Sequence, residues 1–117
     1  KNRVEGSLPK WLFEMTSLVH LNLHHNEFKF SIPSVIGNLT NLEYLDLAYN
    51  SFTGTVPTSI DQLTKLRSLG VYQNDIIGHL LDSVVALSSL TSLQAFMTSI
   101  SGTIPPEIWR LSNLQHF

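Results

Sequence analysis

The sequence contains no cysteine and few charged residues, and these two features exclude several classes of protein. Without cysteine, its 117 residues can form no disulfide, zinc knuckle or thiol nucleophile. Charged residues make up 14% of the chain, against about 25% in an average globular protein, and the net charge is −2. This balance provides no basic surface for nucleic acid or anionic lipid, so we expect no nucleic-acid partner. No apolar run approaches the ~18 residues of a membrane span.

Leucine is abundant, and the leucines recur with a period of 24 residues. The period is marked by asparagines, followed in the next slot by a threonine: Asn2, Asn26, Asn50, Asn74 and Thr98. A glycine slot follows each asparagine after four residues and a proline slot after seven, as at Gly54 and Pro57. Of 19 leucines, 18 fall on the apolar slots of this unit. A fixed period of roughly 20–29 residues with this leucine spacing is typical of a leucine-rich repeat solenoid.

The residue pattern of the 24-residue unit resembles the plant-specific class of leucine-rich repeat. The stretch from Leu42 to Ile60 reads L-x-x-L-x-L-x-x-N-x-F-x-G-x-V-P-x-x-I. Plant receptor-like kinases, receptor-like proteins and polygalacturonase-inhibiting proteins carry this class, and the resemblance covers the whole chain. It implies an α/β fold: a curved right-handed solenoid with a parallel concave sheet and short helical or 3-10 turns on the convex side.

The whole chain, residues 1–117, forms one leucine-rich repeat segment. Four full units span residues 16–39, 40–63, 64–87 and 88–111, with partial units at 1–15 and 112–117. Relatives of this class resemble one another in having cysteine-paired caps, which this sequence lacks. Because an uncapped solenoid leaves apolar end faces open, we expect an internal section of a longer ectodomain, of marginal stability when isolated.

Each slot of the unit has a physical role. The apolar and polar alternation around Leu-x-Leu predicts a short strand with one face inward. The asparagine is expected to end that strand and to bond backbone groups that would otherwise lack partners. The glycine and proline are expected to form the turn and the return path. Three residues depart from the pattern: Thr98 in an asparagine slot, Leu81 in a proline slot and Phe30 in a glycine slot, where the backbone must rearrange or be strained.

Function in such a solenoid is expected on the strand positions that face out of the concave sheet, since the leucines point inward. Adjacent strands lie about 4.7–4.9 Å apart, so Glu43 should pair with Arg67 and Tyr72 should contact Phe96. An exposed aromatic patch on a polar sheet is a surface that anchors a partner. We therefore predict a binding face for a protein or peptide made by His20, Asn22, His24, Glu43, Tyr44, Asp46, Tyr49, Arg67, Tyr72, Gln73, Gln94, Phe96 and Met97.

Neither a metal site nor a catalytic site is expected. His20 and His24 would lie ~13 Å apart along a strand, and no carboxylate or cysteine has ligand spacing beside them. The sequence has no Gly-x-Ser-x-Gly elbow, no His-Glu-x-x-His and no phosphate-binding glycine loop. Glu43 and Asp46 would stand on an open face with no pocket to desolvate them. We expect a protein that is not an enzyme and uses no cofactor.

One modification motif is present. Asn38-Leu39-Thr40 is an N-glycosylation sequon, and Asn38 is placed at the exposed convex end of its unit. Together with the plant-type repeat, the sequon favours an extracellular or cell-surface location.

Three functions follow from the resemblance, and the sequence alone leaves them open. The first is the ligand-reading part of a plant receptor-like kinase or receptor-like protein, acting in defence or disease resistance. The second is a secreted inhibitor of fungal polygalacturonase. The third is ice binding through a regular polar column, but the corresponding column here is irregular: Asn22, Asp46, Gly70 and Gln94. The first is the main prediction.

Overall fold

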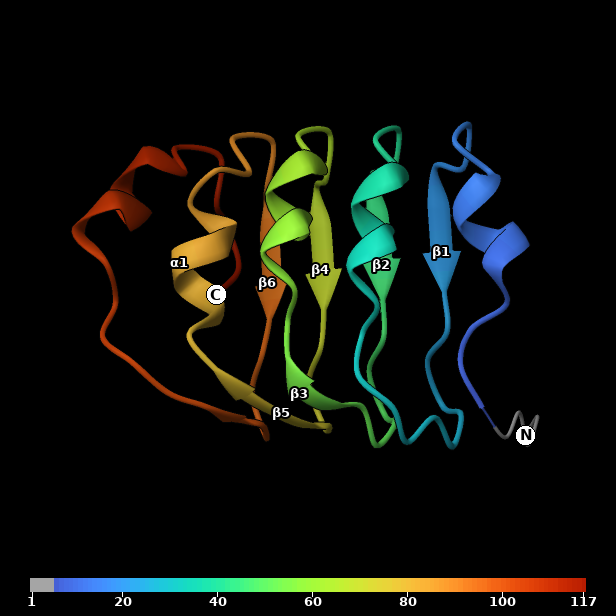
Figure 1. Ribbon diagram of the computed structural model, residues 1–117. Coiled ribbons are helices and arrows are strands. Elements are labelled where there is room, and N and C mark those ends of the chain that lie inside the picture. The colour runs from blue at the N-terminus through green and yellow to red at the C-terminus, as the bar shows by residue number, and fades with distance from the viewer. Residues whose placement is uncertain (1–5) are drawn as a thin grey trace.

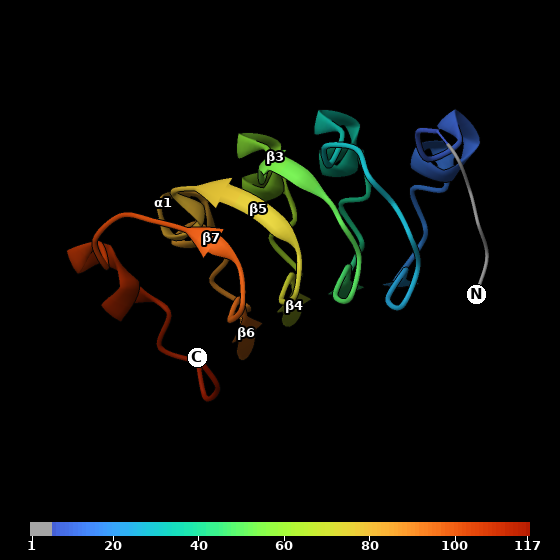
Figure 2. The same cartoon turned by 90° about the horizontal axis from the view of Figure 1, so that it is seen from below.

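The computed structural model describes residues 6–117, so Asn2 of the first partial repeat lies outside the described residues. The chain winds through successive turns from one end of an arc to the other (Figures 1 and 2). Strands line the inner side of the arc and short helices line the outer side (Figure 2). Among residues 6–117, no helix has the length and apolar character that crossing a bilayer requires.

The predicted concave sheet is confirmed. In the described part of the chain it contains four parallel strands in the order β1-β2-β4-β6, namely β1 (His20–Asn22), β2 (Tyr44–Asp46), β4 (Ser68–Gly70) and β6 (Ser92–Gln94). Each residue pairs with the one 24 positions later, as Leu45 does with Leu21 and Leu69. The register therefore equals the sequence period, and every leucine column continues from strand to strand.

A second parallel sheet was not predicted from the sequence. It runs along the segment assigned to the turn and return path, and contains β3 (Thr53–Thr55), β5 (Asp75–Gly78) and β7 (Ser99–Ile100). Its partners lie 22 residues apart rather than 24, as in Gly54 with Ile76. This sheet lies beside the concave sheet at one end of its strands (Figure 1).

Within residues 6–117, the convex side carries five helices of one turn or slightly more. Four are 3-10 helices, each preceded by a proline N-cap: η1 (Lys10–Glu14), η2 (Ser34–Asn38), η3 (Thr58–Gln62) and η4 (Pro106–Arg110). The fifth, α1 (Leu80–Val84), is an α-helix with His79 as its N-cap. A proline disfavours helical backbone at the residue before it, so leucine in place of proline at position 81 allows Leu80 to be helical and α1 to begin before that slot. The departure at Leu81 changes the helix type rather than merely loosening a turn.

The leucine slots form one continuous core, with Leu39, Leu42, Leu63, Leu66 and Leu90 fully buried. Three slots that the pattern assigned to the core are exposed in the structure: Met15, Ile104 and Phe117. They belong to the first and last units, where only one neighbouring unit packs against the slot.

The asparagine column bonds backbone groups as predicted. The Asn74 amide donates to the carbonyls of Leu47, Val71 and Tyr72 at 3.0, 3.0 and 3.2 Å and accepts from the Phe52 N–H at 2.9 Å. The asparagine does not end the strand, however. Each concave strand ends four residues earlier, and the asparagine closes the bend that follows.

The Phe30 departure is resolved by rearrangement. Glycines in the same slot have positive φ, +72° at Gly54 and +89° at Gly78, whereas Phe30 does not. Its unit forms only an isolated bridge between Ser31 and Thr53 instead of a strand. In exchange the Phe30 ring packs at a centroid distance of 5.4 Å against Phe52.

Candidate ligand-binding face

Most of the predicted site residues lie on the strands of the concave sheet or on the bends that follow them, while Glu43 and Arg67 directly precede β2 and β4. Two of the most exposed apolar side chains of this face are Phe96 and Met97, at 58% and 67%. Ala48, which the strand pattern placed in the same outward column as Tyr72, is fully buried. Its single methyl group is too short to reach the surface that the longer side chains of the column form.

Polar contacts occupy the half of the face nearer the N-terminus. The predicted pair is present, with Arg67 Nε 3.1 Å from Glu43 Oε2. His24 Nδ1 lies 3.4 Å from Asp46 Oδ2. The rings of His20 and Tyr44 stack at 4.5 Å with an interplanar angle of 4°. These contacts join β1, β2 and β4 side by side, and as exposed contacts each stabilises the fold only slightly.

A row of touching aromatic rings crosses the bends after the strands. His25 contacts Tyr49 at 4.2 Å, Tyr49 contacts Tyr72 at 5.2 Å, and Tyr72 stacks on Phe96 at 4.5 Å and 18°. We call these four residues the aromatic ladder. The Tyr72–Phe96 contact was predicted from strand spacing. The participation of His25 was not.

The strand pattern did not predict His25 because it does not show the backbone conformation of the bends after the strands. His25, Tyr49, Gln73 and Met97 all have positive φ, between 50° and 56°, although none is glycine. Such a conformation is uncommon for these residue types and turns the side chain out of the regular strand alternation. The recurring position immediately before the asparagine slot is the only sequence signal, and it carries no glycine that would have revealed the turn.

Gly70 makes room on the same face. A Cβ atom at this position would lie 3.0 Å from Asp46 Oδ1 and 3.8 Å from Tyr72 Cε1. The absent side chain thus leaves space for the Asp46 carboxylate, whose Oδ1 accepts the Ala48 N–H at 3.0 Å. It also lets the Tyr72 ring lie close to the sheet.

Partial burial raises the pKa of the Tyr72 phenol above its ordinary value, and electrostatic interaction with Asp46 and then Tyr49 raises it further. The folded state therefore favours the neutral phenol. Its contribution to stability is complete below pH of about 10 and is lost as the pH rises through the folded pKa. We expect the phenolate absorbance difference between wild type and Tyr72→Phe to show a transition above pH of about 10. A transition at or below that value would contradict this account.

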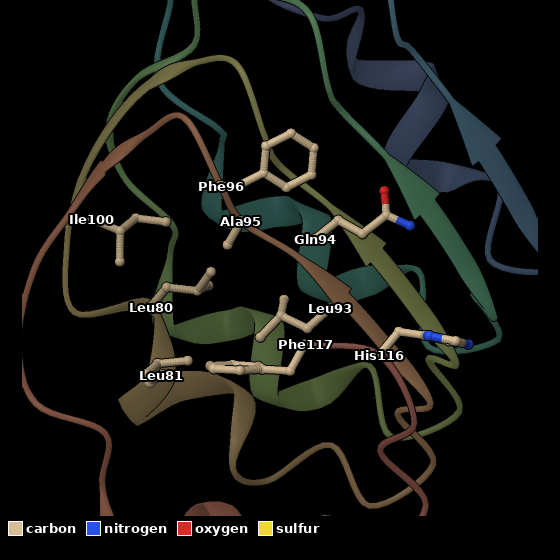
Figure 3. Close-up of a pocket in the computed structure, with 9 residues that line it drawn as sticks. All are labelled: Leu80, Leu81, Leu93, Gln94, Ala95, Phe96, Ile100, His116 and Phe117. Atoms are coloured by element: carbon tan, nitrogen blue, oxygen red, sulfur yellow. The ribbon is translucent and has the colours of Figure 1, made fainter.

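Two hollows adjoin the face. A shallow one of about 340 Å³ lies at the bends, lined by His25, Asn26, Glu27, Tyr49, Asn50 and Gln73. The second, of about 420 Å³, lies at the C-terminal end of the core (Figure 3). There Leu80, Leu93 and Phe117 form an apolar cluster, while Gln94 and His116 point away from it (Figure 3).

Within residues 6–117, no three His, Asp or Glu side chains gather as a metal site would require.

The sequence is similar to a known family of repeat proteins. The leucine-rich repeat model matches residues 1–50 and 32–76, which together cover more than half of the chain. None of the curated proteins that were compared matches the chain.

Several solved structures of plant receptors are similar to the chain. The plant peptide hormone receptor RGFR1, in complex with RGF2, is 39% identical with a TM-score of 0.82 over 85% of this chain. The GASSHO1/SCHENGEN3 ectodomain of Arabidopsis thaliana, in complex with CASPARIAN STRIP INTEGRITY FACTOR 2, is 36% identical with a TM-score of 0.90 over 95%. The Arabidopsis HAESA ectodomain, in complex with an IDA peptide hormone, is 32% identical with a TM-score of 0.88 over 94%.

The chain spans only a small part of each of these ectodomains, namely 16%, 13% and 19% of their lengths. The fold nevertheless agrees over 85–95% of the chain itself. The chain belongs to the leucine-rich repeat family, and within it resembles the plant extracellular members.

Proposed function

We propose that the concave face binds a peptide or protein ligand and that the aromatic ladder anchors it. The observation that carries this proposal is the ladder itself: four rings in a continuous row across four repeats, with Phe96 more than half exposed. Rigid aromatic side chains supply large contact area at low entropic cost, and they are enriched among the residues that dominate binding energy. A partner lying along the ladder would meet rings held by their neighbours.

The similar structures support a peptide as the ligand. The peptide hormone receptor RGFR1 is in complex with RGF2, and HAESA is in complex with an IDA peptide hormone. Both receptors are solenoids of the same fold as this chain. We infer that this chain serves as the ligand-reading part of a plant receptor-like kinase or receptor-like protein outside the cell. A role in defence or disease resistance is the finer part of this proposal.

The test is selection of short peptides from a displayed random library on the wild-type protein. We expect the selected peptides to bind the Tyr72→Ala/Phe96→Ala variant at least about 100-fold more weakly, since the central aromatic anchors of an interface each contribute about 2 kcal/mol or more and the losses of two touching anchors are not fully additive. The matched control is Ile77→Ala, which removes a 52% exposed apolar side chain from β5, outside the concave sheet. Unchanged affinity for the double variant, or an equal loss in the control, would overturn the proposal. Circular dichroism checks that both variants fold.

A second assay distinguishes a receptor ectodomain from a secreted polygalacturonase inhibitor. Purified fungal polygalacturonase is assayed with and without the protein. Under the receptor proposal its activity stays unchanged at protein concentrations that saturate the selected peptides. Inhibition that disappears in the Tyr72→Ala/Phe96→Ala variant would replace the receptor proposal by that of a secreted inhibitor using the same face.

A further inference from the structure

The convex side carries a groove that the concave binding site does not involve. It lies between η1 and η2, with a volume of about 530 Å³. Its apolar walls include Phe13, Pro33 and Val35, and its rim carries the polar side chains of Lys10, Glu14 and Asn38. Val35 is 44% exposed and Phe13 is buried. The groove is therefore amphipathic: apolar inside and polar along its edge.

The groove has a cause in the sequence. At Gly37 the helices η2 and η3 approach so closely that a Cβ atom would lie 2.7 Å from the Ser59 carbonyl oxygen. Ser59 Oγ also donates to the Ser34 carbonyl, which joins these two helices. The equivalent position one repeat earlier is Phe13, a buried residue that lines the groove. Helices η1 and η2 pack less closely than η2 and η3 do, as expected where a phenylalanine replaces the glycine that allows the close approach.

The sequon identified in the sequence lies at the edge of this groove. Asn38 is the last residue of η2; both Asn38 and Thr40 are exposed. Within the described part of the chain, neither the Asn38 amide nor the Thr40 hydroxyl forms a hydrogen bond. The neighbouring Asn41, by contrast, donates to the Thr16 carbonyl and accepts from Lys65. The sequon side chains thus have no structural role that a modification would disrupt.

We propose that Asn38 carries an N-linked glycan and that its first N-acetylhexosamine lies in the groove between η1 and η2. The amide nitrogen of Asn38 forms a bond to the anomeric carbon of a lipid-linked oligosaccharide diphosphate. The bond from that carbon to the diphosphate breaks, and the nitrogen loses one proton. A sugar ring has apolar C–H faces and a polar edge of hydroxyls, which matches apolar walls at Pro33 and Val35 and a polar rim at Lys10 and Glu14.

The placement separates the glycan from the ligand-binding face. Helix η2 lies on the outer side of the arc, whereas the strands of the concave sheet lie on its inner side (Figure 2). The glycan would cover exposed apolar surface on the convex side and leave the aromatic ladder open. This inference rests on the extracellular location given in the proposed function, but not on ligand binding by the concave face, and different measurements test the two.

The modification is tested by secreting the protein from a glycosylating eukaryotic host and measuring its intact mass. We expect a glycan mass that is lost on treatment with peptide N-glycosidase and absent from Asn38→Gln and Thr40→Ala. Thr40→Ser, which preserves the sequon, keeps it. Thr64→Ala is the matched control, since Thr64 occupies the same slot one repeat later without a sequon. A secreted wild-type protein without glycan mass would overturn the proposal.

The position of the first sugar in the groove is tested with an introduced cysteine, because the chain has no native cysteine that would also react. Val35→Cys is alkylated before and after enzymatic removal of the glycan. We expect labelling to be about tenfold slower with the glycan present, since thiol reactivity depends on access to the reagent. Ile77→Cys on β5 is the control and should react equally in both forms. Equal labelling of Val35→Cys in both forms would show that the sugar does not lie in the groove.

Discussion

Replacing Asn74 with alanine is expected to lower the free energy of unfolding by about 3–4 kcal/mol. The Asn74 side chain is only 7% exposed and satisfies three backbone carbonyls and one N–H from two adjacent repeats. Alanine removes all four hydrogen bonds. The Leu47 and Tyr72 carbonyls keep a second donor, from the Asn50 amide at 3.1 Å and the Tyr49 N–H at 3.2 Å. The Val71 carbonyl and the Phe52 N–H lose the Asn74 partner without such a replacement, at a cost of about 1–3 kcal/mol each before relaxation. Urea denaturation followed by circular dichroism measures the effect.

Two other positions of the same column are controls. The Asn26 amide donates to the Leu23 and His24 carbonyls in the first described units and is half-buried, so Asn26→Ala should cost only about 1 kcal/mol. Thr98 donates a single bond, to the Ala95 carbonyl at 2.8 Å, and Thr98→Asn should stabilise the fold. Equal losses of unfolding free energy in Asn26→Ala and Asn74→Ala, or no gain in Thr98→Asn, would contradict this account. Such a result would show that the asparagine column does not stabilise the fold by hydrogen bonding to buried backbone groups. The gain at Thr98 remains measurable even if Asn74→Ala fails to fold.

The core and the concave sheet could be predicted because a single period governs both. A leucine that recurs every 24 residues can be buried only if each repeat occupies the same position in the stack, and this fixes the register of Leu21, Leu45 and Leu69. The second sheet was missed because its strands carry mixed residues, with threonines in β3 and isoleucines in β5. Its 22-residue register also differs from the period that the sequence displays.

The candidate site was predictable to the extent that it follows the strands. Glu43 with Arg67 and Tyr72 with Phe96 are neighbours because strand spacing makes them so. The rest of the aromatic ladder depends on the positive φ of residues such as His25 and Tyr49. Because these residues are not glycine, the sequence does not indicate that conformation. Ala48 was misplaced for a related reason: strand alternation gives the direction of a side chain, but not whether longer neighbours cover it.

Replacing Phe52 with alanine is expected to cost about 3–5 kcal/mol, since the ring is fully buried and its removal leaves a cavity in the core. Its ring centroid lies 5.6 Å from that of Phe28 and 5.4 Å from that of Phe30. Ile76 occupies the same slot one repeat later and is equally buried, so Ile76→Ala controls for burial alone. We expect Phe52→Ala to be the more destabilising variant by about 1 kcal/mol, the contribution of aromatic contacts beyond buried area. Urea midpoints of both variants provide the comparison.

The same aromatic contacts explain why a bulky residue is tolerated in the glycine slot at Phe30. That unit lacks a second-sheet strand, and the ring contacts with Phe28 and Phe52 offset the missing backbone pairing. A double-mutant cycle of Phe30→Leu and Phe52→Leu isolates the contact without opening a large cavity, and a coupling energy of about 0.5–1.5 kcal/mol is expected. Additive effects of the two substitutions would instead mean that Phe30 stabilises the fold by burial alone. In that case Phe30→Leu, which keeps most of the apolar surface, would leave the stability nearly unchanged.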